Sequence, residues 1–305
     1  MPELPEVETI ARGVDRRLRN DRIDSVWFGE KRESFKSPPP EMAAALLGKR
    51  IARVSRVGKH IVFDLAEDRS GGADAAPTRS AGSRGRSGRA RASGPGRQTR
   101  PASQWIVHLG MTGRLLVADP ATPAPPHTHA ILRLASGREL RFVDPRRFGR
   151  LSLQVAPEGA AAGFRGSGKE PLTISSRDFI ALFRSRGASI KAALLDQKLL
   201  QGIGNIYADE SLFRAGIRPR RRAARLTRIQ LHRLHASLLS VLREAIALGG
   251  SSVSDYVDAE GLQGFFQLEH RVYMRRGLPC LVCATPIRRI EVAGRGTHYC
   301  PICQK

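Results

Sequence analysis

Four cysteines lie in the last 26 residues of the 305-residue chain, in two pairs with the same spacing. Two residues separate Cys280 from Cys283, sixteen residues follow, and two residues separate Cys300 from Cys303. Two such knuckles supply four thiolates to one tetrahedral zinc ion, as in a zinc ribbon. Because the protein would fill all four positions, no room remains for a catalytic water, and we expect one structural Zn²⁺. The alternative, a pair of disulfides, suits an oxidising compartment.

Acidic residues crowd the amino terminus, MPELPEVETI, where Glu3, Glu6 and Glu8 stand beside two prolines. Acidic residues and proline are favoured in the first turn of a helix, since carboxylates complement the positive end of the helix dipole. Apolar residues then recur at helical spacing, which predicts an amphipathic helix beginning near Leu4. They are Leu4, Val7, Ile10, Ala11, Val14 and Leu18. Composition alone favours this structural role for the carboxylates.

The charge of the chain indicates a polyanionic partner. The formal net charge is +23, the pI is about 11.3, and Arg greatly outnumbers Lys among the 51 basic residues. Arg matches phosphate geometry bidentately, so nucleic acid is favoured over a membrane. The chain has no run of 18 apolar residues, and its amino terminus is acidic where a signal peptide would be basic. We therefore expect a soluble, cytoplasmic protein.

Residues 69–104 form a segment of low complexity, made almost wholly of Gly, Ala, Ser, Pro, Thr and Arg. Without apolar periodicity, this composition predicts a disordered insertion. The segment carries eight Arg against one Asp, so most of the positive charge belongs to the rest of the chain. A solvated linker is the favoured interpretation, and a dedicated DNA-binding tail is the alternative.

The remaining pattern predicts an α+β protein of several domains. Short stretches with strand character and intervening turns fill residues 1–156, as in a sandwich or barrel, with one small helix around residues 40–47. The expected strands are 22–28, 51–57, 60–65, 105–110, 129–134, 139–143 and 150–155. Residues 157–174 read as a linker. Helical patterns follow at 175–184, at 189–200 and after Thr227, where Thr227 and Gln230 form a capping box.

Five separated motifs together resemble the bacterial formamidopyrimidine-DNA glycosylases, of the formamidopyrimidine-DNA glycosylase and endonuclease VIII family. They are PELPEVET (2–9), HLGMTGRL (108–115), DPRRFG (144–149), DQKLLQGIGNIYADE (196–210) and GRGTHYCPICQ (294–304). The resemblance implies an N-terminal β-sandwich with a catalytic N-terminal helix (1–156), a helix-two-turn-helix domain (175–264) and a zinc-ribbon finger (265–305). It further implies a monomeric, nucleoid-associated bacterial enzyme whose partner is double-stranded DNA containing oxidised bases or abasic sites.

The family's chemistry implies catalytic roles for residues at both ends of the chain. Removal of Met1 would expose Pro2 as a secondary amine that attacks the damaged sugar and forms a Schiff base. Glu3 would be the proton donor, and Glu6 the second carboxylate, although a structural role for Glu6 is equally open. Lys59 would donate a proton or contact phosphate beside the damaged nucleotide. Arg295 would donate a proton in the δ-elimination or contact phosphate.

The same resemblance implies a set of DNA contacts. Met111, Arg146 and Phe148 would enter the duplex when the damaged base is flipped out, with Arg147 beside them in DPRRFG. His108 would contact a phosphate. In GIGN (202–205), glycines would let the backbone approach a phosphate, while Asn205 would cap the next helix and, with Lys191, lie on the DNA backbone.

One segment departs from the family's pattern. DAEGLQGFFQ (258–267) stands where many members carry a Lys-Pro-Gly-Tyr-Phe type run that closes over the flipped base. The expected activity is excision of oxidised purines with cleavage of the abasic site by β,δ-elimination. The divergent loop leaves two alternatives open: an endonuclease VIII-like preference for oxidised pyrimidines, or a noncatalytic zinc-ribbon DNA-binding relative.

Overall fold

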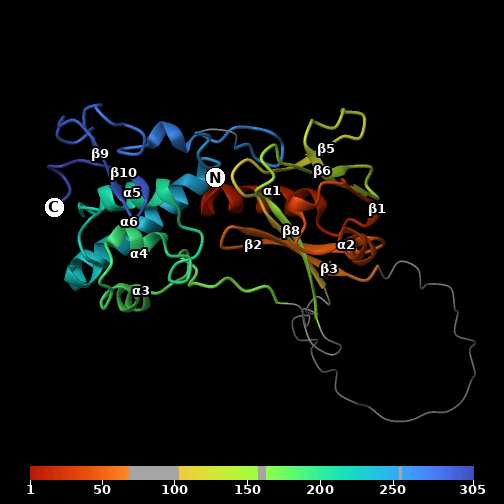
Figure 1. The fold of residues 1–305 in the computed structure, drawn as a ribbon, viewed down its shortest axis with the longest axis horizontal. Coiled ribbons are helices and arrows are strands. Elements are labelled where there is room, and N and C mark those ends of the chain that lie inside the picture. The colour runs from red at the N-terminus through yellow and green to blue at the C-terminus, as the bar shows by residue number, and fades with distance from the viewer. Residues whose placement is uncertain (69–102, 157–162, 254–255) are drawn as a thin grey trace, which may run out of the picture.

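The computed structural model describes residues 1–68, 103–156, 163–253 and 256–305. The predicted insertion lies outside these ranges, except for its last two residues. Figure 1 shows an elongated molecule with a β-rich half at one end and a helical half with a small hairpin at the other. In the described ranges, no helix is long and apolar enough to cross a membrane.

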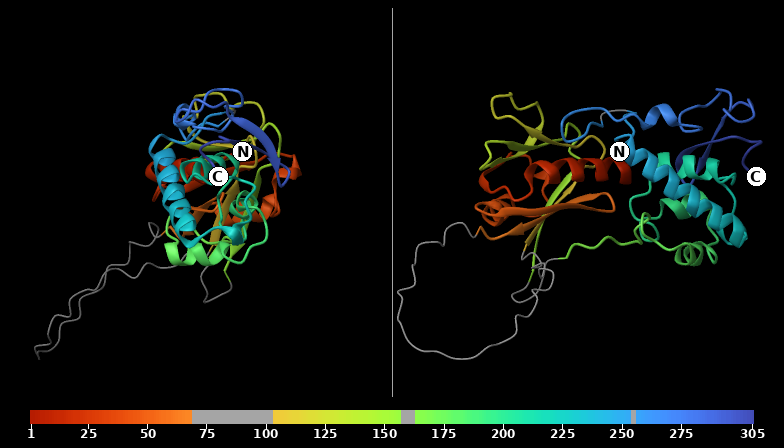
Figure 2. Two further views of the ribbon diagram at one scale, coloured as in Figure 1. Left: turned by 90° about the vertical axis from the view of Figure 1, so that its left-hand side faces the viewer. Right: turned by 180° about the vertical axis from the view of Figure 1, so that it is seen from behind.

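Helix α1 (Leu4–Leu18) connects the two halves. Its apolar stripe is buried as predicted, but the stripe is divided between two cores. Leu4 packs in the helical half, while Val7 and the later apolar residues pack in the sandwich. The right-hand view of Figure 2 shows α1 running from the junction of the halves into the sandwich. The amino terminus therefore lies at the interface between the domains.

Two four-stranded antiparallel sheets make the sandwich, in the orders β2-β3-β4-β8 and β1-β6-β7-β5. The strands are β1 (Ile23–Phe28), β2 (Arg50–Val57), β3 (His60–Ala66), β4 (Ser103–His108), β5 (Arg114–Ala118), β6 (Thr128–Leu134), β7 (Glu139–Val143) and β8 (Arg150–Val155). Helix α2 (Pro39–Leu46) and the short 3-10 helix η1 (Arg32–Ser34) follow β1. Phe63, Trp105 and Phe142 are fully buried between the sheets.

The structure changes two predictions for this half. Ser103 and Gln104 are not part of the insertion, because they pair with Leu65 and Asp64 as the first residues of β4. Strand β5 is absent from the predicted set, since of its five residues only Leu115 is fully buried and the alternation that identifies a strand is weak.

The helical half contains α3 (Ser176–Phe183), α4 (Ile190–Leu195), α5 (Asn205–Arg214) and α6 (Arg228–Ala247), with 3-10 helices η3 (Ala223–Arg225) and η4 (Phe266–Glu269). Thr227 and Gln230 form the predicted capping box of α6. The helix predicted through residue 200 ends earlier, at Leu195. There Asp196 leaves the helix, and its carboxylate accepts a hydrogen bond from Lys198 N at 2.9 Å, which favours a turn.

Two segments tie the helical half back to the sandwich. Residues 163–174 of the predicted linker are packed, since Glu170 forms a 2.6 Å ion pair with the nearly buried Arg56 of β2; residues 157–162 lie outside the described ranges. Residues 256–260, placed in the helical domain by the sequence, lie against the sandwich. There Val117 N donates to Ala259 O at 2.9 Å, and Glu260 pairs with Arg17 at 2.6 Å.

The carboxyl-terminal finger is built around the hairpin of β9 (Arg288–Val292) and β10 (Arg295–Tyr299). Its two turn residues, Ala293 and Gly294, have φ values of 52° and 69°. Positive φ at both central residues is the pattern of a type I′ turn, which suits the twist of a hairpin. Arg295 is therefore held at the start of β10, directly after a tight turn.

Candidate active site and DNA interface

The Glu3 carboxyl lies at the amino-terminal end of α5. Its two oxygens accept hydrogen bonds from Ile206 N at 3.1 Å and Tyr207 N at 3.4 Å. Only 4% of Glu3 is exposed. Burial raises the pKa of Glu3 to about 7, with Glu6 adding to the rise, while Lys59 and the two amides oppose it. A carboxyl with this pKa is half protonated near neutral pH and can act as a general acid.

Gly204 leaves the space that the Glu3 carboxyl occupies. A Cβ at this position would lie 2.2 Å from the Glu3 Cδ and 2.3 Å from Oε1, so no side chain fits. Gly202 has a φ of +87° and faces Leu4. The glycines of GIGN thus admit the protein's own amino-terminal residues. The sequence-based expectation that they also bring the backbone to a phosphate stays a prediction.

Glu6 is surrounded by donors. It accepts hydrogen bonds from Glu3 N at 2.8 Å, Ser251 N at 2.8 Å and the Tyr207 hydroxyl. Burial raises the pKa of Glu6, and these hydrogen bonds oppose the rise. Because one of the donors is the backbone of Glu3 itself, Glu6 fixes the start of α1 against α5 and the segment that follows α6. The structural role that the sequence left open for Glu6 is therefore present.

Lys59 interacts electrostatically with both Glu3 and Arg295, and Pro2 precedes Glu3 in the chain. Pro2 is buried, whereas Met1 is 49% exposed. Lys59 lies in the turn between β2 and β3. Burial lowers its pKa; Glu3 and Glu6 raise it, and Arg295 lowers it. Lys59 of the sandwich is thus coupled electrostatically to the start of α1 and to the β9-β10 hairpin.

Two loops of the sandwich present apolar side chains to solvent. Met111 is 41% and Phe148 is 47% exposed, and the Arg146 guanidinium lies 4.8 Å from the centre of the Phe148 ring. The loops touch through their backbones, because a Cβ at Gly110 would lie 2.5 Å from Gly149 N. The sequence predicted this grouping of Met111, Arg146 and Phe148. Arg147 instead directs its guanidinium to Glu33, at 3.1 Å.

Asp144 fixes these loops, and the sequence analysis missed it. This carboxylate is fully buried and accepts hydrogen bonds from Thr112 Oγ1 at 2.6 Å and Gly149 N at 2.7 Å. It thereby joins the Met111 loop to the Phe148 loop. The signal was available in DPRRFG, since an Asp at the start of a turn commonly binds backbone amides.

The surroundings of His108 favour a neutral imidazole. Burial is the main cause that lowers its pKa to about 4, and His60, Lys59 and Arg150 add to the effect. Its Nδ1 accepts a hydrogen bond from Gly110 N at 3.2 Å. In a neutral imidazole the other nitrogen, Nε2, then carries the proton and is available as a donor.

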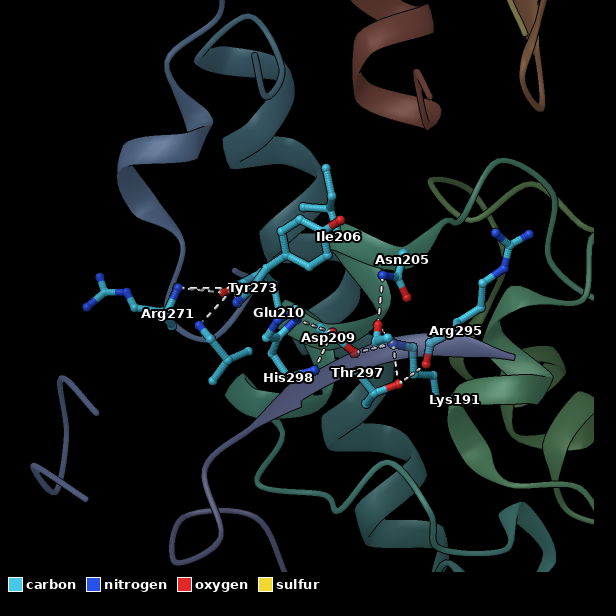
Figure 3. Close-up of polar contacts among 12 residues, drawn as sticks. Lys191, Asn205, Ile206, Asp209, Glu210, Arg271, Tyr273, Arg295, Thr297 and His298 are labelled. Carbon is cyan, nitrogen blue, oxygen red and sulfur yellow. Dashed lines mark hydrogen bonds and ion pairs between the residues drawn. The ribbon is translucent and has the colours of Figure 1, made fainter. Parts of the chain in front are cut away.

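Lys191 and Asn205 do not occupy the positions that the sequence suggested. Lys191 has no exposed surface, and its ammonium lies 2.7 Å from Asp209 Oδ1. The buried ammonium gives no support to the expected contact between Lys191 and the DNA backbone, which stays a prediction. Asn205 is the first residue of α5 and Gly204 is the cap. The Asn205 amide donates instead to Gly296 O, at 2.9 Å (Figure 3).

The four cysteines converge as predicted. Their sulfur atoms all lie within 4.8 Å of one another. Cys280 and Cys300 also accept hydrogen bonds from the backbone amides of Val282 and Cys303, at 3.5 and 3.4 Å. Four thiolates at this spacing, with amide donors to the sulfurs, fit a closed tetrahedral zinc site. Zinc in such a site has a structural role, as the sequence predicted.

Comparisons with known proteins agree over the whole chain. Three family models match it, described as the formamidopyrimidine-DNA glycosylase N-terminal domain (residues 1–151), the formamidopyrimidine-DNA glycosylase H2TH domain (168–257) and a zinc finger found in FPG and IleRS (277–305). A formamidopyrimidine-DNA glycosylase of Solibacter usitatus is 42% identical over 306 residues, with all of both chains covered. The chain belongs to the formamidopyrimidine-DNA glycosylase family.

Solved structures of this family share the fold. The FPG protein from Thermus thermophilus is 37% identical, with a TM-score of 0.76 and coverage of 99% of this chain and 98% of that one. A variant of the Lactococcus lactis FPG, bound to DNA containing Fapy-dG, is 30% identical, with a TM-score of 0.80 and full coverage of both chains. The α+β multidomain architecture predicted from the sequence is confirmed.

The divergent loop of this glycosylase-family member is well anchored at its base. Leu262 N donates to Asp258 Oδ1 and Asp258 N to Leu262 O, both at 2.8 Å. Gly264 N donates to Ser252 Oγ at 2.9 Å. Leu262 and Phe265 are each more than 60% exposed. A cavity of about 390 Å³ opens between this loop and the Arg146 loop, lined in part by Tyr256 and Gln263.

Proposed function

We propose that this chain excises oxidised purines from duplex DNA and then cleaves the abasic strand by β,δ-elimination, with Pro2 as the nucleophile. Family membership makes it a DNA glycosylase with abasic-site lyase activity. The residue assignment is supported by the electrostatic coupling of Lys59 to the buried Glu3, which follows Pro2 in the chain, and to Arg295 of the β9-β10 hairpin. Its relatives include FPG structures with Fapy-dG DNA and with abasic-site DNA.

Pro2 suits covalent chemistry once Met1 is removed. An α-amino group has a pKa near 8, whereas a lysine amine has one near 10.4, so about a hundredfold more of it is neutral at pH 7. Attack by this secondary amine on the sugar C1′ forms a C–N bond and displaces the base with the electrons of the glycosidic bond. The nitrogen then loses its proton, the C1′–O4′ bond breaks as O4′ is protonated, and the opened sugar carries a cationic iminium at C1′. The iminium accepts electrons from the C2′–H bond, and the 3′ phosphate then leaves with the electron pair. A second elimination releases the 5′ phosphate.

Glu3 and Lys59 supply the proton transfers in this scheme. Glu3 holds a proton near neutrality and gives it to the leaving base or to the sugar ring oxygen as the C1′ bond breaks. Lys59, with its pKa lowered by burial, provides a donor beside the sugar phosphates. Arg295 pairs with the phosphate that departs in the δ step. Zinc holds the finger that carries Arg295 and takes no part in bond breaking.

The duplex would lie along the interface, with its damaged nucleotide turned toward Pro2. Flipping leaves a gap in the stack, which Met111 and Phe148 can fill as apolar wedges while Arg146 hydrogen-bonds the orphaned base. His108 and Asn205 remain candidates for phosphate contacts, and so does Arg147 if DNA displaces its surface pair with Glu33. We infer that the enzyme works as a monomer in the cytoplasm, associated with the nucleoid.

A cleavage assay on defined lesions tests this function and its rivals. Duplexes containing 8-oxoguanine, a formamidopyrimidine or an oxidised pyrimidine, each opposite every base, are incubated with the zinc-loaded chain. We expect the purine lesions opposite cytosine to be cut fastest, leaving phosphates at both ends of the gap. Faster cutting of oxidised pyrimidines would favour the endonuclease VIII-like alternative. Binding without cutting of any duplex would favour the noncatalytic one.

A further inference from the structure

Helix α5 supports the two sides of the proposed site at once. On one side its first amides hold Glu3, and the Tyr207 hydroxyl holds Glu6. On the other side, Asp209 Oδ2 accepts a hydrogen bond from His298 N of β10 at 2.8 Å. Asn205, Asp209 and their contacts with the hairpin are drawn in Figure 3. The position of the hairpin relative to Glu3 therefore depends on contacts made along a single helix.

A buried ion pair reinforces the attachment of the hairpin. Lys191 of α4 and Asp209 of α5 have no exposed surface, and their charged atoms lie 2.7 Å apart. The same ammonium donates to Gly296 O at 3.2 Å and to Thr297 Oγ1 at 2.8 Å. Gly296 O also accepts from the Asn205 amide. Side chains of α4 and α5 thus bind Gly296 and Thr297, the two residues that follow Arg295.

Thr297 connects this buried pair to Arg295. Its side chain is fully buried, and its hydroxyl accepts from Lys191 while donating to the carbonyl oxygen of Arg295 at 2.9 Å. The Arg295 guanidinium points away from the buried pair in Figure 3. A two-stranded hairpin is marginally stable by itself. The backbone of Arg295 is therefore fixed by the Thr297 hydroxyl and its buried partners as well as by the β9-β10 ladder.

We propose that Lys191, Asp209 and Thr297 are positioning residues for Arg295, and that they set the efficiency of the second, δ-elimination step. This inference rests on the proposed role of Arg295. Pro2 and Glu3 carry the first step and are held by other contacts of α5. Loosening the hairpin without unfolding it should therefore slow the δ step selectively. The strand would accumulate as the β product, which still carries the unsaturated sugar on its 3′ end.

The test compares Thr297→Val with Thr297→Ser in the full zinc-loaded chain. Valine keeps the branched shape and removes the hydroxyl, whereas serine keeps the hydroxyl. On duplex DNA with an abasic site under single turnover, we expect Thr297→Val to lower the ratio of β,δ to β product at least fivefold. Borohydride trapping of the Schiff base should stay within twofold of the parent chain. Thr297→Ser should restore the parent product ratio.

Lys191→Met extends the test, with Lys49→Met as its matched control because Lys49 also forms an ion pair, with Glu67, in the sandwich. We expect Lys191→Met to accumulate β product and Lys49→Met to behave as the parent. Zinc content and melting temperature are measured for each chain. An unchanged product ratio in Thr297→Val, or equal losses of trapping and δ product, would overturn the inference. Absence of trapping in the parent chain would instead reject the proposed function.

Discussion

The pKa of the Glu3 carboxyl is set by opposing electrostatic effects. It is nearly inaccessible to solvent, yet it lies at the positive end of α5 and close to Lys59. Burial favours the protonated form, and the amides and the lysine favour the charged form. The balance leaves a pKa of about 7, which is where a general acid can both hold and release a proton.

Replacing Glu3 with glutamine should separate the effect of its carboxyl on stability from its effect on base excision. The folded pKa of about 7 is above the ordinary 4.5, so the carboxyl stabilises the fold fully below pH 4.5, and this contribution is lost as the pH rises to 7. The free energy of unfolding of the parent should therefore fall between pH 4.5 and 8. That of Glu3→Gln should fall by about 3 kcal/mol less over the same range. Its rate of base excision should fall about 10²-fold or more.

Urea unfolding at several pH values and single-turnover excision measure these two quantities. Glu41→Gln, at an exposed position of α2, serves as the control. The parent excision rate should decline above pH 7 as one proton is lost. A flat parent profile from pH 6 to 9, or unimpaired excision by Glu3→Gln, would show that Glu3 is not the proton donor.

Gly204 offers a second test at the scale of one residue. Its φ is −132°, which any residue can adopt, so the only obstacle to alanine is the contact between the new Cβ and the Glu3 carboxyl. Gly204→Ala should displace that carboxyl and destabilise the fold by about 1–3 kcal/mol, as for other overpacked sites. Excision should fall more than trapping on a preformed abasic site. Gly187→Ala, where nothing lies within 4 Å of the new atom, should change neither.

Motif residues could be predicted where the chemistry is local to the sequence. The cysteine spacing predicted the zinc cluster, and the motifs grouped Met111 with Arg146 and Phe148. The burial of Lys191 was not predicted, because its partner Asp209 lies on a different helix and Thr297 lies more than a hundred residues away. No local pattern reveals that a lysine will be buried by such a pair. Thr297 and Tyr207 were missed for the same reason, whereas Asp144 was missed although DPRRFG contains a local signal for it.

Elements followed the sequence where their periodicity was clear. Helix α1 begins at Leu4 and helix α6 begins after Thr227, as their caps and apolar stripes predicted. Strand β5 and the end of α4 escaped prediction, since weak alternation marks the first and a local turn at Asp196 decides the second. Helix α5 is the element on which the proposed site depends, because residues in its first half contact both α1 and the β9-β10 hairpin.

Removing zinc tests the role of the carboxyl-terminal finger. The buried cluster of the finger is small: Val272, Cys280, Ile287 and Cys300 pack there with Phe213 of α5. So small a core needs the metal to stay folded. Chelation should therefore lower affinity for abasic-site DNA at least tenfold, measured by fluorescence anisotropy, and readdition of Zn²⁺ should restore it. Unchanged affinity in a metal-free chain would show that the finger folds or functions without zinc.

The two halves of the molecule are joined by more than one segment. Helix α1 contributes to both cores, residues 256–260 pack on the sandwich, and Arg56 pairs with Glu170 across the junction. Since Pro2, Lys59 and Arg295 come from different parts of the chain, the proposed site requires that the halves be docked. Sequence patterns could delimit the halves, but the docking depends on these long-range contacts.

The positive charge of the whole chain predicts a strong dependence of binding on salt. Each phosphate contact that releases a counterion contributes a slope of about −0.9 in a plot of log K against log salt concentration. Arg295→Ala and His108→Ala should each weaken binding across DNA sequences, and the arginine change should reduce the slope by about one contact. Titrations at several NaCl concentrations measure this. A slope near zero would contradict the proposed phosphate contacts.

Borohydride trapping on duplex DNA with an abasic site tests the central claim most directly. The claim is that the amine of Pro2, once uncovered, bonds to the damaged sugar. We predict one covalent adduct, which mass spectrometry of the digested protein maps to the peptide that begins at Pro2. The adduct should disappear in Pro2→Gly and when a tag is left on the amino terminus. An adduct on another amine, or full activity of a chain that retains Met1, would contradict the account.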